Sequence, residues 1–100
     1  MSKTSEREAI IAQLVTAIQK ERLRQNLSLS EIASRAGLDR TMIMRVEKRE
    51  RLPTIDTLLR IADALEIKLS SVLAAAEKAV RQATGKPRPQ SLTSRSKTSA

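Results

Sequence analysis

The sequence predicts an all-α fold of five helices in one small domain. Apolar residues recur at helical spacing in five segments, and polar stretches or helix-capping residues separate each segment from the next. One hundred residues, of which 40% are apolar, suffice for one modest core. Because Phe, Tyr and Trp are absent, that core must be built from Ile, Leu, Val, Ala and Met.

The composition also excludes several classes of function. The chain has no Cys and no His, which removes disulfides, thiol nucleophiles, zinc fingers and the usual general base. Without aromatic residues it lacks the stacking platforms of single-strand binders and many RNA modules. No apolar run approaches the roughly 18 residues of a membrane helix. We therefore expect a cytoplasmic protein that is not an enzyme and needs no cofactor, metal or membrane.

The net charge of +8 favours a polyanionic partner, although basic solvated surfaces are also common. Four of the nineteen Lys and Arg residues lie in the last seventeen positions, which contain no acid and are rich in Gly, Pro, Ser and Thr. We predict that residues 84–100 form a disordered basic tail and that residues 1–83 form the domain.

The first helix is expected over about Ser5–Gln25. Glu residues near its start and Lys and Arg residues near its end suit the helix macrodipole. Asn26 can adopt the left-handed conformation that ends a helix. The apolar positions at helical spacing are Ile10, Ile11, Leu14, Val15 and Ile18.

A short second helix and a glycine turn follow. Ser28 and Glu31 match the S-x-x-E capping box, which predicts a helix over 29–36. Gly37 stands where this helix must stop within one residue and turn, and such a turn requires a positive φ.

The third helix, which Asp39 caps over about 40–49, has two unlike sides. The side suited to the interior carries Ile43, Val46 and Glu47. The opposite side combines a hydroxyl, a thioether and bases, whereas an ordinary solvated face would include acids. Its residues are Thr41, Met44, Arg45 and Lys48.

Two further helices complete the domain. Pro53 and Thr54 open the fourth helix. Its expected buried stripe is Ile55, Leu58, Leu59, Ala62 and Leu65. The fifth helix, over about 69–82, repeats apolar residues along one side at Leu69, Val72, Leu73, Ala76 and Val80.

The arrangement expected for the second and third helices predicts a way of binding DNA. The major groove of B-DNA admits one α-helix, and a small protein presents such a helix by crossing it steeply with another. Steep crossing requires a small residue at the contact, a Gly in the turn and apolar residues on the inner side. The sequence meets these requirements with Ala33, Gly37, Leu38, Ile43 and Val46.

Over about Ile18–Leu73 the sequence resembles the lambda Cro/repressor-like (XRE) helix-turn-helix family. The two-helix unit over 29–48 is the centre of the resemblance. Further matches, in order, are Arg22, Glu47, Pro53 with Thr54, and the segment LLRIADALEIKLSSVL. The resemblance implies a compact five-helix lambda repressor-like DNA-binding domain of bacterial or phage origin, in which the third helix is the recognition helix.

The resemblance also implies which residues read bases. Arg40, Thr41 and Arg45 occupy positions that usually touch base edges, with Met44 beside them. Arg45 can donate two hydrogen bonds to guanine, and Thr41 or Met44 can meet a thymine methyl. In the alternative interpretation, Arg40 and Arg45 contact only phosphate and Met44 only fills a gap against Arg45.

Two other groups of residues are expected to support recognition. Arg22 and Glu47 match a pair that forms a salt bridge in this family, and a carboxylate on the inner side of the third helix would be costly without a partner. Phosphate contacts are expected from helix N-termini and from the connection after the third helix. The residues concerned are Ser28, Lys48, Arg49, Arg51 and Thr54.

The sequence departs from the family pattern at several positions, among them three at helix ends. Leu29 replaces the Gln that often touches a phosphate at the start of the second helix. Arg49 and Glu66 stand where family members usually have Gly at helix ends. A non-Gly residue at positive φ costs about 1 kcal/mol, so these ends are either arranged differently or accept the strain.

A partner copy is expected because one recognition helix reads too few base pairs for a useful site. Family members bind as twofold dimers on palindromic DNA. The predicted interface is the apolar side of the fifth helix, namely Val72, Ala76, Ala79 and Val80. In the alternative, that side only packs against the first helix.

The sequence therefore predicts a sequence-specific repressor that binds double-stranded DNA as a homodimer and associates with the nucleoid. An alternative from another class is an antitoxin or a restriction–modification controller whose main partner is a co-encoded protein, such as a toxin, docked through the helical domain.

Overall fold

The computed structural model describes residues 3–84, and these residues form five helices joined by short connections. In order they are α1 (Lys3–Arg24), α2 (Leu29–Ala36), α3 (Arg40–Glu47), α4 (Ile55–Leu65) and α5 (Leu69–Thr84). The predicted all-α class is confirmed. Thr84 ends α5, and the rest of the predicted tail lies outside the described residues. None of the five helices is long and apolar enough to cross a membrane.

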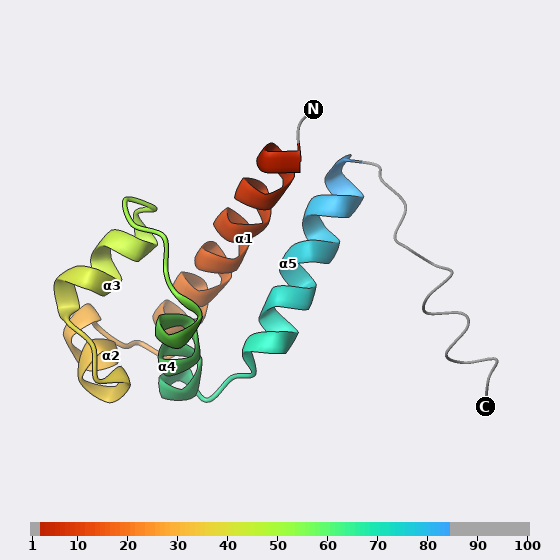
Figure 1. Cartoon of the computed structure of the whole chain (residues 1–100). Coiled ribbons are helices and arrows are strands. Elements are labelled where there is room, and N and C mark those ends of the chain that lie inside the picture. Colours follow the sequence, from red (N-terminus) through yellow and green to blue (C-terminus); the bar gives the residue numbers. More distant parts are fainter. Residues whose placement is uncertain (1–2, 85–100) are drawn as a thin grey trace.

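The two long helices, α1 and α5, lie antiparallel and side by side, whereas α2, α3 and α4 gather at the C-terminal end of α1 (Figure 1). Ile32, Ile43, Ile61 and Leu65 are the largest fully buried side chains, and they come from α2, α3 and α4. The centre of the core therefore holds the three short helices together, and α1 and α5 close it from one side. The buried cluster consists of Leu14, Ile18, Leu27, Ile32, Ala33, Ile43, Leu58, Ile61, Leu65 and Ala76.

Capping side chains begin the three shorter helices, as the sequence predicts. At α2, Ser28 Oγ accepts a hydrogen bond from the Glu31 amide at 3.0 Å, and the Glu31 carboxylate accepts one from the Ser28 amide at 2.8 Å. The hydrogen bond from the Ser28 backbone lowers the pKa of Glu31. The capping box thus contributes stability above the ordinary glutamate pKa and loses it as the pH falls through the lowered one. Asp39 caps α3 and Thr54 caps α4.

Left-handed residues follow the first four helices, and two of these residues have side chains where the family usually has Gly. Arg49 has φ +60° and Glu66 has φ +59°, so the domain accepts the strain at both positions. Because Arg49 is left-handed, α3 ends at Glu47, two residues earlier than the sequence predicts. Asn26, with φ +59°, is left-handed after α1, as expected.

The predicted buried stripe of α4 needs a correction. Ile55 and Leu59 are 65% and 46% exposed, whereas Ile61, which was not predicted to be buried, is 2% exposed. Ile55 lies in the first turn and Leu59 on a flank of the helix. Thr57 also faces inward, and its hydroxyl accepts a hydrogen bond from Thr54 Oγ1 at 3.0 Å, which satisfies the buried polar group.

The interface predicted on α5 also needs a correction. Ala76 and Val80 are 4% and 5% exposed within a single chain, so they have no surface left for a second copy. The physical reason is that α1 runs along α5 and covers this side of it (Figure 1). Ala79 is exposed and Val72 is half-buried, and their role at an interface stays a prediction.

The strained end of α4 gives a test of the backbone argument. We expect Glu66→Gly to raise the free energy of unfolding by about 1 kcal/mol, because Gly adopts positive φ without a Cβ clash. Glu66→Ala, which removes the same charge but keeps the Cβ, is the matched control and should not stabilise. Urea denaturation measures both, and equal stability of the two variants would contradict the argument.

Candidate nucleic-acid interface

The turn between α2 and α3 is built around Gly37. This residue has φ +68°, and the amide of Leu38 donates to the carbonyl of Ala33 at 2.9 Å to close the end of α2. A Cβ at Gly37 would lie 3.4 Å from a guanidinium nitrogen of Arg60 on α4. The positive φ favours glycine here, because any other residue would be strained. Leu38 is partly buried against the core, where it fills the angle of the turn.

This turn fixes which side of α3 faces the solvent. Ile43 and Val46 are 1% and 4% exposed and anchor the inner side. The predicted base-reading residues Arg40, Thr41 and Arg45 are all exposed, and Met44 beside them is half-buried. Arg40, Thr41 and Arg45 are therefore accessible to a DNA groove, whereas Met44 is only partly accessible. Both interpretations of these residues stay predictions.

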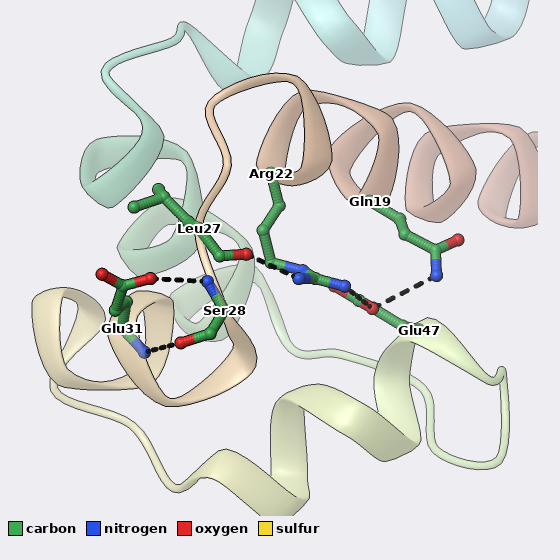
Figure 2. A network of polar contacts seen from close by, with 6 residues as sticks. All are labelled: Gln19, Arg22, Leu27, Ser28, Glu31 and Glu47. Atoms are coloured by element: carbon green, nitrogen blue, oxygen red, sulfur yellow. Dashed lines mark hydrogen bonds and ion pairs between the residues drawn. The ribbon is translucent and has the colours of Figure 1, made fainter.

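A buried ion pair ties α3 to α1 (Figure 2). Arg22 donates from Nε to Glu47 Oε2 at 2.7 Å and from Nη2 to Glu47 Oε1 at 2.9 Å, and the two side chains are only 10% and 7% exposed. This is the salt bridge that the sequence predicts. Its bidentate geometry fixes the orientation of both side chains as well as their separation.

Two further contacts complete the pair, and the sequence predicted neither of them. Arg22 Nη1 donates to the carbonyl of Leu27 at 2.7 Å, and Gln19 Nε2 donates to Glu47 Oε1 at 3.3 Å (Figure 2). Among the described residues no buried side-chain nitrogen or oxygen is left without a partner. Gln19 could have been found, because it stands one turn before Arg22 on the same helix. The Leu27 carbonyl had no sequence signal.

The ion pair also decides the charge of the outer surface. Glu47, the only acid within α3, is turned inward and neutralised. The outer side of α3 and the connection to α4 therefore present mainly bases, although Glu50 is also exposed there. These exposed bases are Arg40, Arg45, Lys48, Arg49 and Arg51.

The predicted phosphate contacts at helix N-termini become more specific in the structure. The capping box uses the amides of Ser28 and Glu31, and the Ile32 amide donates to the Ser28 carbonyl, so the open amides at the start of α2 are those of Leu29 and Ser30. At α4, the hydroxyl of Thr54 donates to Thr57 Oγ1 and accepts from the Thr57 amide, both at 3.0 Å. At the start of α4 a phosphate can therefore accept hydrogen bonds from the backbone amides that follow Thr54. It cannot accept one from the Thr54 hydroxyl, whose proton is already donated to Thr57.

The sequence matches a known family and a set of solved structures. A helix-turn-helix family model (HTH_3) matches residues 18–72. The restriction–modification controller protein C.Esp1396I is 27% identical, with a TM-score of 0.61 over 67% of this chain and 90% of that one. No curated protein matches the chain.

Two point mutants of the same controller protein are also similar. One is 26% identical, with a TM-score of 0.66, and the match covers 73% of this chain and 95% of that one. The other, solved bound to its highest-affinity operator site, is 26% identical with a TM-score of 0.64 over 72% and 95% of the two chains.

The buried pair gives a stability test. We expect Glu47→Ala to lower the free energy of unfolding by about 3 kcal/mol, because it leaves the Arg22 guanidinium buried without its counter-charge. The matched control is Asp56→Ala, which breaks an exposed ion pair to Arg60 and should change stability by less than about 1 kcal/mol. Thermal and urea denaturation measure both, and an unchanged Glu47→Ala would mean that the pair does not hold α3.

Proposed function

Because this chain belongs to the lambda Cro/repressor-like (XRE) helix-turn-helix family, we propose that it represses transcription by inserting α3 into the DNA major groove. It is a DNA-binding transcriptional regulator, and its partner is double-stranded DNA. The fold and family are those of regulators and not of enzymes. The observation that carries the proposal is the outer side of α3, which is exposed and basic while its one acid is neutralised inside.

The mechanism follows from the two sides of α3. Ile43 and Val46 pack into the core and Glu47 pairs with Arg22, so α3 enters the groove at a fixed tilt. A helix held in this way loses little conformational entropy when it binds. Preorganisation of the recognition helix is thus the role of the ion pair, which itself does not touch DNA.

Base reading is assigned to residues on the outer side of α3. Arg45 donates two hydrogen bonds to guanine O6 and N7, while Thr41 meets a thymine methyl and Arg40 a neighbouring base edge. Met44, which is half-buried, supports Arg45 and meets the DNA only with its exposed part.

Phosphate contacts flank this reading side. Lys48, Arg49 and Arg51 are exposed on the connection to α4, and the open amides that follow Ser28 and Thr54 point out from two helix N-termini. Such contacts set the register of the domain on the duplex and carry no sequence information. They also make binding dependent on salt.

The functional unit is a homodimer on a palindromic operator. A twofold dimer presents two copies of α3 to half-sites about 34 Å apart, which doubles the length of sequence that is read. With DNA as its partner, the protein is cytoplasmic and associated with the nucleoid.

A restriction–modification controller is the second candidate role, and the similarity to C.Esp1396I favours it. In this role the same DNA contacts bind an operator site, as one of the similar structures does. An antitoxin that docks on a co-encoded toxin is a third role, and it predicts that Arg40, Thr41 and Arg45 can be replaced without loss of function.

Selection of bound sequences from a random duplex pool tests the function directly. We expect a palindromic consensus with two half-sites about one helical turn apart, because two recognition helices related by a twofold axis read it. Weak binding without sequence preference would overturn the proposal and favour a protein partner.

Two substitutions separate base reading from phosphate contact. We expect Arg45→Ala to weaken binding to the selected consensus by about 1–3 kcal/mol and to relax the preference at one base pair of each half-site. Arg51→Ala should instead weaken binding to all sequences evenly and reduce the salt slope by about one unit for each protein copy. Binding isotherms at several salt concentrations measure both effects. If Arg45→Ala behaves like Arg51→Ala, Arg45 contacts only phosphate.

A further inference from the structure

We propose that a groove between α1 and the connection from α3 to α4 binds a small monocarboxylate with an apolar chain, and that this ligand lowers the affinity of the protein for DNA. The binding of the carboxylate stands on the groove alone. Its effect on DNA rests on the proposed function, because it acts through residues that the proposed function assigns to phosphate contacts.

The groove has a volume of about 280 Å³ and a mostly apolar lining. Val15 on α1 and Val46 on α3 line its deepest part, since they are only 2% and 4% exposed. Ile11 and Ala12 line it from α1 and are half-buried, whereas Leu52 lines it from the connection and is 72% exposed. An apolar ligand would therefore cover surface that the single chain leaves open to water.

The size of the groove limits the occupant. Its volume holds about nine groups the size of a water molecule, which each take about 30 Å³. Sites for larger organic ligands have volumes of about 300–1,000 Å³, so this groove lies just below their range. It thus suits a chain of about eight carbons, and it is too small for a nucleotide or for a helix of another protein.

The charged residues that line the groove select a carboxylate. Arg49 and Arg51 lie on the side of the connection, and Glu8 lies on the side of α1. Within residues 3–84 none of these three side chains forms an ion pair. A guanidinium binds a carboxylate with two parallel hydrogen bonds, and two guanidiniums outweigh the one acid. Glu8 in turn disfavours a ligand with a second negative charge, such as a phosphate ester.

The same two arginines connect the groove to DNA binding. Arg49 and Arg51 follow α3 directly, and in the proposed function they contact phosphates. A guanidinium that binds the ligand carboxylate is no longer available to a phosphate, so the ligand removes up to two phosphate contacts from each copy. Because phosphate contacts carry no sequence information, we expect the same loss of affinity on every DNA sequence.

An NMR titration of the ¹⁵N-labelled full chain with sodium octanoate tests the site without DNA. We expect saturable shifts of the amide signals of Val15, Val46 and Leu52. Octanamide, which keeps the chain but has no charge, and acetate, which keeps the charge but has no chain, should each bind about tenfold more weakly or less. Sodium chloride at the same concentration controls for ionic strength.

Two kinds of variant test the two halves of the site. Ala12→Leu adds a larger side chain to the groove and should raise the dissociation constant for octanoate about tenfold or more. Ala9→Leu is the matched control, since Ala9 is also half-buried on α1 but does not line the groove, and it should bind octanoate like the wild type. The Arg49→Gln/Arg51→Gln double variant should remove the preference for octanoate over octanamide. Circular dichroism checks that all three variants fold.

Three results would overturn the site. They are the absence of saturable shifts, equal binding of octanoate and octanamide by the wild type, and unchanged octanoate binding by Ala12→Leu. A second copy of the chain is the rival occupant of the groove. In that case octanoate binding weakens as the protein concentration rises, and Ala12→Leu lowers the oligomeric state in sedimentation equilibrium, which also overturns the ligand.

A DNA arm separates this inference from the proposed function. At saturating octanoate we expect the wild type to bind the duplex selected from the random pool about tenfold more weakly, and Ala12→Leu to bind it as tightly as without octanoate. An unchanged DNA affinity of the octanoate-bound wild type overturns the effect on DNA. If the wild type binds octanoate in the groove but prefers no DNA sequence, the proposed function fails and the carboxylate site stands.

Discussion

The bidentate ion pair between Arg22 and Glu47 is the constraint on which the presentation of α3 depends. A carboxylate at the end of α3 lies on the inner side of the helix, where a charge without a partner would oppose folding. Arg22 neutralises it and also donates to the carbonyl of Leu27, so one guanidinium joins α1, the α1–α2 connection and α3. The tilt of the recognition helix is thereby fixed before any DNA is present. The same contact removes the one acidic side chain of α3 from the outer surface, so orientation and electrostatics have a common origin.

Helix ends supply the second constraint. Capping side chains and left-handed residues set where each short helix starts and stops, and together they leave connections of only a few residues. Gly37 meets this need without strain, whereas Arg49 and Glu66 meet it at a cost of about 1 kcal/mol each. At Arg49 the cost is offset in the proposed function, since a side chain there adds a positive charge beside the reading side. At Glu66 nothing in the structure offsets it.

The surface of the domain divides into parts with different physical characters. The outer side of α3 and the following connection are basic, and this suits a polyanion. The start of α4 and the connection before it expose the apolar side chains of Ile55 and Leu52, and charges of both signs lie on the same helix. Leu52 lies in the connection that joins the two.

The sequence by itself determined the features that depend on local signals. The five helices, the capping box of Ser28 and Glu31, the glycine turn, the two sides of α3 and the partner of Glu47 follow from spacing, cap chemistry and resemblance to a family. Tertiary structure decided which of several apolar stripes faces inward. On α4, Ile55 and Leu59 were as apolar as Ile61, and only packing against α2, α1 and α5 selected the side that is buried. On α5, the length of α1 decided that Ala76 and Val80 are core residues. Periodicity identifies an apolar side, but the element that covers it lies elsewhere in the chain, and no local pattern encodes that contact.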